Sequence, residues 1–293
     1  MSGADGRWQR FDEGLEVGLT TGLRIGSELY RETSAFYDLA IYETTDFGRA
    51  LVMDNIIQTT ERDEFVYHEM LTHTPIFAHG GATDVLIIGG GDGGMLEEVL
   101  KHRSVRRATM VEIDGHVVDL CRKYIPGICG KAFEDPRTDL VIADGAAYVR
   151  DTDARFDVII IDSPDPMGPA KVLFEEPFYM NCKRVLRPGG VVVRQNGIPL
   201  LQTDELEEAM TLLGRHFADV ACYMATVPTY TGAHMAFGWA SDDPAKRAVE
   251  VEMLARRHAA SGIATRYWSP TLHRGAFAVP AYVEAVVEKA RRR

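Results

Sequence analysis

The sequence has little cysteine, no long apolar run and no excess of basic residues. Only four of its 293 residues are cysteines, and none of them form a Cys-x-x-Cys pair. Each lies in an apolar stretch, which predicts buried structural thiols rather than a metal or redox site. These residues are Cys121, Cys129, Cys182 and Cys222.

Membrane and secretion signals are also missing from the pattern. No stretch approaches the roughly 20 apolar residues that span a bilayer, and the first residues lack the basic and then apolar order of a secretory signal. We therefore expect a cytoplasmic protein that has no membrane partner.

The charge balance is acidic, with 43 Asp and Glu against 32 Lys and Arg and a formal net charge of −11. Such a chain repels phosphate backbones and attracts cations. We expect no nucleic-acid partner and favour a cationic substrate. The 46% share of hydrophobic residues is typical of a packed globular protein, and 293 residues allow one large domain and a smaller one.

Two different hydrophobic rhythms divide the chain. Residues 8–60 alternate polar and apolar positions between turn signals at 46–48 and 54–55, which predicts a small antiparallel β unit. Residues 61–73 then read as helical, and after Gly80 and Gly81 apolar runs alternate with amphipathic helical stretches. We therefore predict an N-terminal β domain over residues 1–62 and an α/β domain over 63–293.

The apolar runs of the second part are short and continuous, as in parallel strands that are covered on both faces. They lie at 84–89, 108–112, 140–144, 156–162 and 190–193, with further strands near 220–225 and 234–240. Helices are predicted at 61–73, 95–102, 117–124, 177–186 and 204–217. This order predicts a doubly wound, mostly parallel sheet.

A glycine-rich turn, residues 89–94, follows the first of these strands and opens a helix. Glycines there allow a tight turn and a close approach to a ligand, although a packing turn or a dinucleotide loop would look similar. Asp92 within it is unsuited to a pyrophosphate because like charges would meet. The loop therefore favours a ligand that carries an ammonium group.

Acidic residues end the next two strands. Glu112 lies 18 positions beyond Gly94, close to the roughly 20-residue interval at which an acid accepts hydrogen bonds from a ribose. Asp144 and Gly145 end the third strand, where the carboxylate could accept from an adenine amino group or merely cap a helix. Together with the glycine turn, these residues indicate an adenosine ligand.

A loop with two carboxylates, residues 162–169, follows the fourth strand at the edge where such sheets bind ligands. A protonated alkyl amine cannot attack carbon until it loses a proton. One of Asp162 and Asp165 could take that proton while the other holds the cation. Alternatively, both could only bond to backbone amides in an Asx-type turn.

His68, Glu69 and His73 superficially resemble the zinc-binding motif H-E-x-x-H. The two histidines are five positions apart, so they project from a helix roughly 140° apart and share no face. We predict no metal site here.

The motifs at 61–70, 89–94 and 162–169 together resemble the polyamine aminopropyltransferase family, above all the bacterial spermidine synthases. The resemblance runs from Trp8 to about residue 280. It implies a Rossmann-like sheet of the methyltransferase type. It also implies transfer of the aminopropyl group of decarboxylated S-adenosylmethionine, a co-substrate, to putrescine, giving spermidine and methylthioadenosine without a further cofactor. Homodimers or homotetramers are usual in the family.

The resemblance also implies roles for particular residues. Asp162 corresponds to the proton acceptor. The residues that correspond to the nucleoside site are Gln58, His68, Asp92, Glu112, Asp144 and Gly145. Those that correspond to the polyamine site are Trp8, Tyr67, Asp162, Asp165 and Tyr230, and Pro169 corresponds to a residue of the flexible loop over the site. Outside the resemblance, each tyrosine could be a core aromatic.

Three positions depart from the family pattern. Tyr37 stands where many relatives carry glutamine, Phe11 where an acid is common, and Pro164 where a small hydroxyl residue is common. The Phe11 change leaves open which amine is preferred among putrescine, cadaverine, agmatine and longer polyamines. An ordinary S-adenosylmethionine methyltransferase and a binding protein without turnover are the alternative hypotheses.

Overall fold

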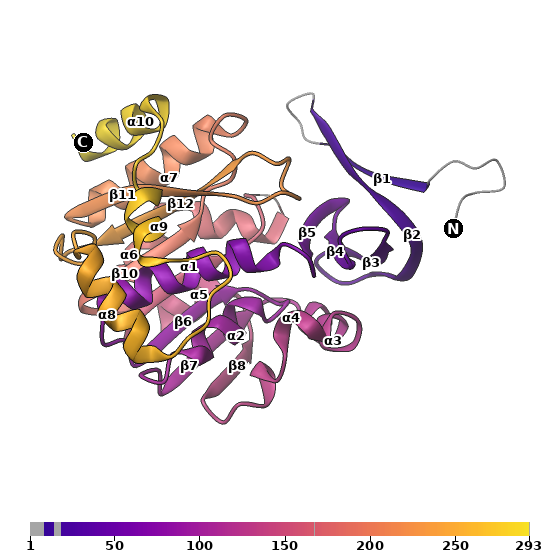
Figure 1. Cartoon of the computed structure of the whole chain (residues 1–293), viewed down its shortest axis with the longest axis horizontal. Helices are drawn as coiled ribbons and strands as arrows, with labels where there is room; N and C mark the ends of the chain where they lie inside the picture. Colours follow the sequence, from indigo (N-terminus) through magenta and orange to yellow (C-terminus); the bar gives the residue numbers. More distant parts are fainter. Residues whose placement is uncertain (1–8, 15–18, 167, 293) are drawn as a thin grey trace.

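Two β-sheets organise the chain in the computed structural model, which describes residues 9–14, 19–166 and 168–292 (Figure 1). The first sheet is antiparallel and has the strand order β1-β2-β3-β4-β5. Its strands are β1 (Gln9–Gly14), β2 (Thr20–Thr33), β3 (Asp38–Thr44), β4 (Arg49–Met53) and β5 (Ile56–Thr60). The predicted N-terminal antiparallel unit is thereby confirmed. Asp54 and Asn55 form the β4–β5 turn with φ of 49° and 65°, a conformation that these two residue types tolerate.

The second sheet has the strand order β11-β12-β10-β9-β6-β7-β8. The five adjacent strands β10, β9, β6, β7 and β8 run parallel, and β12 runs antiparallel to both β10 and β11. The strands are β6 (Asp84–Gly89), β7 (Arg107–Glu112), β8 (Thr138–Ile142), β9 (Phe156–Asp162), β10 (Leu186–Gln195), β11 (Asp219–Thr226) and β12 (His234–Ser241). The predicted doubly wound, mostly parallel sheet is confirmed.

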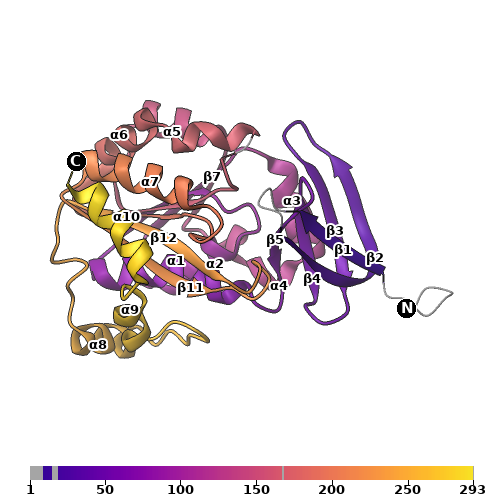
Figure 2. The ribbon, with the colours of Figure 1, turned by 90° about the horizontal axis from the view of Figure 1, so that it is seen from above.

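Helices cover both faces of the second sheet (Figure 2). One face packs against α1 (Glu64–His79), α2 (Gly94–Lys101), α8 (Val251–Ser261) and α9 (Pro270–Ala276). The other packs against α5 (Gly145–Asp151), α6 (Glu176–Val185), α7 (Thr203–His216) and α10 (Ala281–Arg291). The remaining helical segments are α3 (Gly115–Tyr124), α4 (Pro126–Cys129), η1 (Ala132–Glu134) and η2 (Gly168–Phe174). Within the described ranges, no helix is both long and apolar enough to cross a bilayer.

Burial on both faces explains the continuous apolar runs. Along β6, Val85 and Ile87 face one core cluster, whereas Leu86 and Ile88 face the other. Side chains alternate across a strand, so a strand covered on both sides needs apolar residues at every position. All four cysteines are buried with free thiols, as predicted.

The antiparallel sheet packs against α3 and α4 beside the second sheet. Leu39, Ile41 and Leu51 of the first sheet share a buried cluster with Val117 and Leu120 of α3. This contact holds β4 and β5 opposite the carboxyl ends of the parallel strands. The predicted domain boundary at residues 62 and 63 falls between the end of β5 and the start of α1.

Glu69, in the middle of α1, anchors a distant part of the chain. Its side chain is buried and accepts hydrogen bonds from the backbone amides of Arg266, Tyr267 and Trp268 at 2.7, 2.8 and 2.7 Å. His68 and His73, on either side in the sequence, contact different partners, Asp92 and His102. Glu69 is therefore a structural residue that holds the segment before α9 against α1.

We expect the substitution Glu69→Gln to lower the free energy of unfolding by about 3 kcal/mol, because an amide cannot replace a carboxylate that accepts three hydrogen bonds in a buried site. Denaturant unfolding measures the change. The control is Glu252→Gln on the exposed side of α8, which should change stability by less than about 0.5 kcal/mol. Equal effects of the two substitutions would contradict the anchoring role.

Candidate active site

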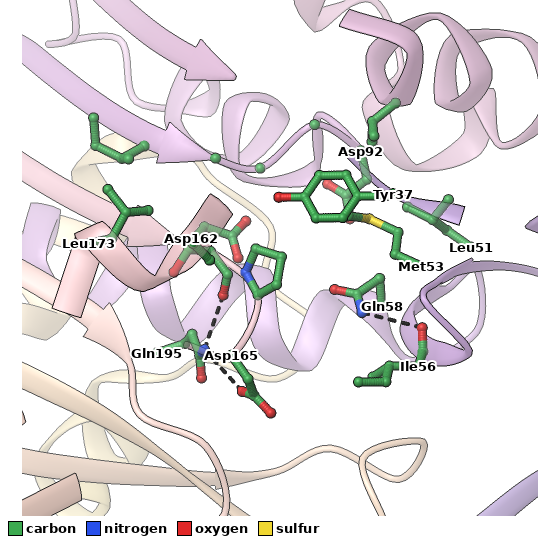
Figure 3. Close-up of a pocket in the computed structure, with 18 of the residues that line it drawn as sticks. Tyr37, Leu51, Met53, Ile56, Gln58, Asp92, Asp162, Asp165, Leu173 and Gln195 are labelled. Carbon is green, nitrogen blue, oxygen red and sulfur yellow. Dashed lines mark hydrogen bonds between the residues drawn. The ribbon is translucent and has the colours of Figure 1, made fainter. Parts of the chain in front are cut away.

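A pocket lies where the carboxyl ends of the parallel strands face the antiparallel sheet (Figure 3). Tyr37, Met53 and Gln58 line it from the first sheet. The glycine turn after β6 and the loop after β9 line it from the second sheet. Both predicted parts of the chain therefore contribute walls to the same cavity, at the edge of an open α/β sheet where ligands bind.

The glycine turn brings the ends of β6 and β9 together. Gly89 has φ of 85°, and a Cβ there would lie 2.0 Å from the carbonyl oxygen of Asp162. The amide of Gly90 donates to the same carbonyl at 3.0 Å. Only glycine combines this backbone conformation with so close an approach. The turn thus sets the distance between Asp92 and Asp162 as well as shaping the pocket.

Asp92 is held at the start of α2. Its Oδ1 accepts a hydrogen bond from the amide of Gly94 at 2.8 Å, and its Oδ2 lies 3.4 Å from Nε2 of His68. The ring of His68 packs directly on Gly94, where a Cβ would lie 2.2 Å from Cε1. Burial opposes the charged form of His68, but Asp92 and Glu64 outweigh it and hold the His68 pKa well above its usual value.

Asp162 ends β9 inside the pocket. Its Oδ1 accepts a hydrogen bond from the hydroxyl of Tyr67 at 2.6 Å. Burial, and then the charge of Asp92, raise the pKa of Asp162 to about 6, while His68 and Tyr67 act in the opposite direction. A carboxylate with a pKa near neutrality can take a proton and release it again at physiological pH.

Asp165 lies beside two glutamines. It accepts from Nε2 of Gln202 at 2.8 Å and lies 3.4 Å from Nε2 of Gln195, which also donates to the carbonyl of Ser163 (Figure 3). Burial raises the pKa of Asp165. The described partners of Asp162 and Asp165 are side chains of other elements, so an Asx-type turn does not explain this loop. Neither glutamine was predicted; Gln195 lies within the resemblance but had no assigned role.

The two predicted tyrosines meet at one wall. The rings of Tyr67 and Tyr230 are in edge contact with centroids 5.9 Å apart, and both residues line the pocket. The hydroxyl of Tyr230 donates to the backbone carbonyl of Gln58. Tyr230 therefore ties the β11–β12 connection to β5 of the first sheet.

Glu112 and Asp144 occupy the end of the pocket nearest β7 and β8. Burial raises the pKa of Glu112 to about 7, although its Oε1 accepts from the amide of Asp114 at 2.9 Å. Asp144 accepts from the amide of Ala147 at 2.9 Å and so caps α5, the alternative considered from the sequence. Asp144 and Gly145 nevertheless line the pocket, so capping and ligand contact are compatible.

The structure brings nearly all of the predicted site residues to this one pocket. Its lining includes Gln58, Tyr67, His68, Asp92, Glu112, Asp144, Gly145, Asp162, Asp165, Pro169 and Tyr230. Trp8 lies outside the described residues, as does the side chain of Phe11. The other two departures from the family pattern, Tyr37 and Pro164, also line the pocket. A pocket lined by several carboxylates suits a cationic small molecule.

Comparison with known proteins agrees with this arrangement. The family model described as the spermine/spermidine synthase domain matches residues 64–250, and the spermidine synthase tetramerisation domain matches residues 11–61. Polyamine aminopropyltransferase 1 of Pseudomonas aeruginosa is 50% identical over 95% of this chain and 98% of its own. The polyamine aminopropyltransferase of Serratia proteamaculans is 51% identical over 87% of this chain and 89% of its own.

Solved structures extend the comparison to the fold. A spermidine synthase in complex with the transition-state analogue AdoDATO superposes with a TM-score of 0.90 at 34% identity, covering 96% of this chain and 95% of that one. The spermidine synthase of Thermotoga maritima gives 0.87 at 33% identity, covering 96% and 94%. The chain belongs to the spermine/spermidine synthase family and is an aminopropyltransferase. The methyltransferase alternative is thereby set aside.

We expect Gly94→Ala to destabilise the protein by about 1–3 kcal/mol, because the added methyl group would overlap the buried ring of His68. Denaturant unfolding measures the change. The control is Gly81→Ala, where an added Cβ has no neighbour within 4 Å. Equal stability of the two variants would contradict the close packing of the His68 ring on Gly94.

Proposed function

We propose that the protein is a spermidine synthase, which transfers the aminopropyl group of decarboxylated S-adenosylmethionine to putrescine. The observation that supports this best is the presence of Asp92 and Asp162 in one pocket of an aminopropyltransferase. One carboxylate suits the ammonium of the nucleoside, and the other suits the amine that attacks. Both substrates are cations, so an acidic pocket offsets their charge.

The nucleoside occupies the side of the pocket that the glycine turn borders. Glu112 accepts from the ribose hydroxyls at the end of β7, and Asp144 and Gly145 lie toward the adenine. Gln58 and His68 complete this side, and Asp92 faces the aminopropyl ammonium. All six residues line the pocket, which supports the assignment.

The amine occupies the side formed by Tyr67, Tyr230 and Asp165, and Trp8 is assigned to its far end. Asp162 accepts a proton from the ammonium of putrescine, leaving a neutral amine. The nitrogen lone pair then forms a bond to the carbon next to the sulfonium while the carbon–sulfur pair returns to sulfur. Methylthioadenosine leaves uncharged, and the positive charge passes to spermidine.

The sulfonium is an activated leaving group, so the protein need supply only alignment, proton transfer and a favourable field. We therefore assign no metal or further cofactor to the reaction, and neither nucleic acid nor membrane as a partner. Pro169 is assigned to the loop that covers the site. The match of residues 11–61 to a tetramerisation domain supports a homodimer or homotetramer.

Incubation with decarboxylated S-adenosylmethionine and a panel of amines tests the proposed function. We expect spermidine and methylthioadenosine from putrescine, at a higher kcat/KM than with cadaverine, agmatine or spermidine itself. Chromatography of the products measures this. A higher kcat/KM with another amine would overturn the assignment to putrescine, and the absence of any aminopropylated product would indicate a binding protein without turnover.

We expect Asp162→Asn to lower kcat by at least about 100-fold, because general base catalysis contributes roughly 10²–10⁴-fold. In the unsubstituted enzyme, kcat/KM should rise with pH through about 6, since only the ionised form of Asp162 accepts a proton. Calorimetry should show that the variant still binds the nucleoside. Asp119→Asn, on the exposed face of α3, is the control with unchanged kcat. Near-normal turnover by Asp162→Asn would contradict its role as the base.

A further inference from the structure

Glu64 contacts the active site from outside the pocket. It is the first residue of α1, and its Oε2 lies 2.7 Å from Nδ1 of His68, one helical turn away. On the other side of the ring, Nε2 of His68 lies 3.4 Å from Oδ2 of Asp92. His68 and Asp92 line the pocket, but Glu64 does not. The side chains of His68, Asp92 and Glu64 are only 3%, 11% and 15% exposed.

Both ring nitrogens of His68 therefore face carboxylate oxygens. A neutral imidazole carries one N–H and would leave its other nitrogen without a proton opposite an acceptor, whereas the imidazolium donates on both sides. The contacts thus favour the charged ring. Burial acts against this charge, and so does the positive end of α2, which begins against the ring at Gly94.

The other charged and titratable groups around His68 have clear partners. From α2, Glu97 lies 2.8 Å from Lys101, which also pairs with Glu98 at 2.7 Å. From β9, Asp162 contributes a further negative charge and accepts from the hydroxyl of Tyr67. Glu64 therefore differs from Asp92 and Asp162, because it contacts His68 but does not line the pocket.

We propose that Glu64 is a positioning residue that keeps His68 protonated and thereby favours the ionised form of Asp162. Two buried carboxylates in one pocket repel each other and favour the uptake of a proton. The imidazolium lies between Glu64 and Asp92 and offsets that repulsion before the cationic substrates arrive. The catalytic part of this role rests on the proposed function, whereas the protonation of His68 does not.

The titration of His68 by imidazole ¹H–¹⁵N NMR tests the proposal without any activity measurement. We expect the titration midpoint of His68 to lie well above that of an ordinary imidazole in the unsubstituted protein. In Glu64→Gln its midpoint should fall by about one to three pH units, the effect of losing an opposite charge at contact distance. Glu64→Asp, which keeps the charge on a shorter side chain, should give a smaller fall and covers the case in which Glu64→Gln does not fold.

Glu97→Gln is the matched control, because it removes a carboxylate from the neighbouring helix that has no contact with His68. It should leave the His68 midpoint within about 0.5 unit, since Glu97 is paired with Lys101 and does not contact the ring. An unchanged midpoint in Glu64→Gln would overturn the proposal, as would an equal fall in the control.

The pH profile of kcat/KM tests the link to catalysis. The acidic limb of this profile reports the pKa of Asp162. Removal of the negative charge of Glu64 would by itself lower that pKa, whereas loss of the positive charge of His68 would raise it. A shift of the limb to higher pH in Glu64→Gln therefore shows that His68 has lost its proton. In a His68→Gln background, Glu64→Gln should cause no further upward shift. A limb that stays in place or moves to lower pH would overturn the catalytic link. If no variant forms product but the NMR shift occurs, the proposed function fails and the role of Glu64 in protonating His68 stands.

Discussion

The repulsion between two buried carboxylates is the constraint on which the site depends. Asp92 and Asp162 share one pocket that is open to substrates but shielded enough from water to raise the pKa of Asp162. Each carboxylate has defined neighbours: Gly94 and His68 contact Asp92, and the hydroxyl of Tyr67 donates to Asp162. Repulsion between two such carboxylates raises the electrostatic free energy of the protein without a ligand, and a bound cation lowers it. This charge distribution suits the cationic substrates that we propose for the site.

The fold supplies this arrangement through the adjacent ends of β6 and β9. The register pairs Gly89 with Asp162, and the glycine turn lets the two backbones approach closely enough for Gly90 to donate to the Asp162 carbonyl. α1 passes beneath this edge and supplies Tyr67 and His68 in succession, with Glu69 anchoring the helix from its buried side. The antiparallel sheet then closes the pocket with residues such as Gln58. Within one turn of α1, Tyr67 and His68 therefore line the pocket and Glu69 stabilises the fold.

Much of the fold could be predicted because burial on both faces leaves a distinct pattern. Strands β6, β7 and β9 were placed within a residue or so of their observed ends, as were helices α2, α6 and α7. Helices α5, α8 and α9 were not predicted. Each is short or has only a few buried residues, so apolar residues recur too rarely in it to show a helical periodicity. Within the site, the acidic residues at strand ends were found from position alone. Tyr67 and Tyr230 were assigned only by resemblance, because a lone tyrosine has no distinguishing pattern.

The sequence by itself determined the class of fold and the edge of the sheet at which the pocket lies, because periodicity and strand ends are properties of the linear chain. Only the tertiary structure decided which groups meet. It joined Gln195 and Gln202 to Asp165, and Glu64 to Asp92 through His68. It also decided the ionisation behaviour of Asp162 and Glu112. A pKa depends on burial and on charges a few ångströms away, and neither is defined until residues far apart in the chain are packed together.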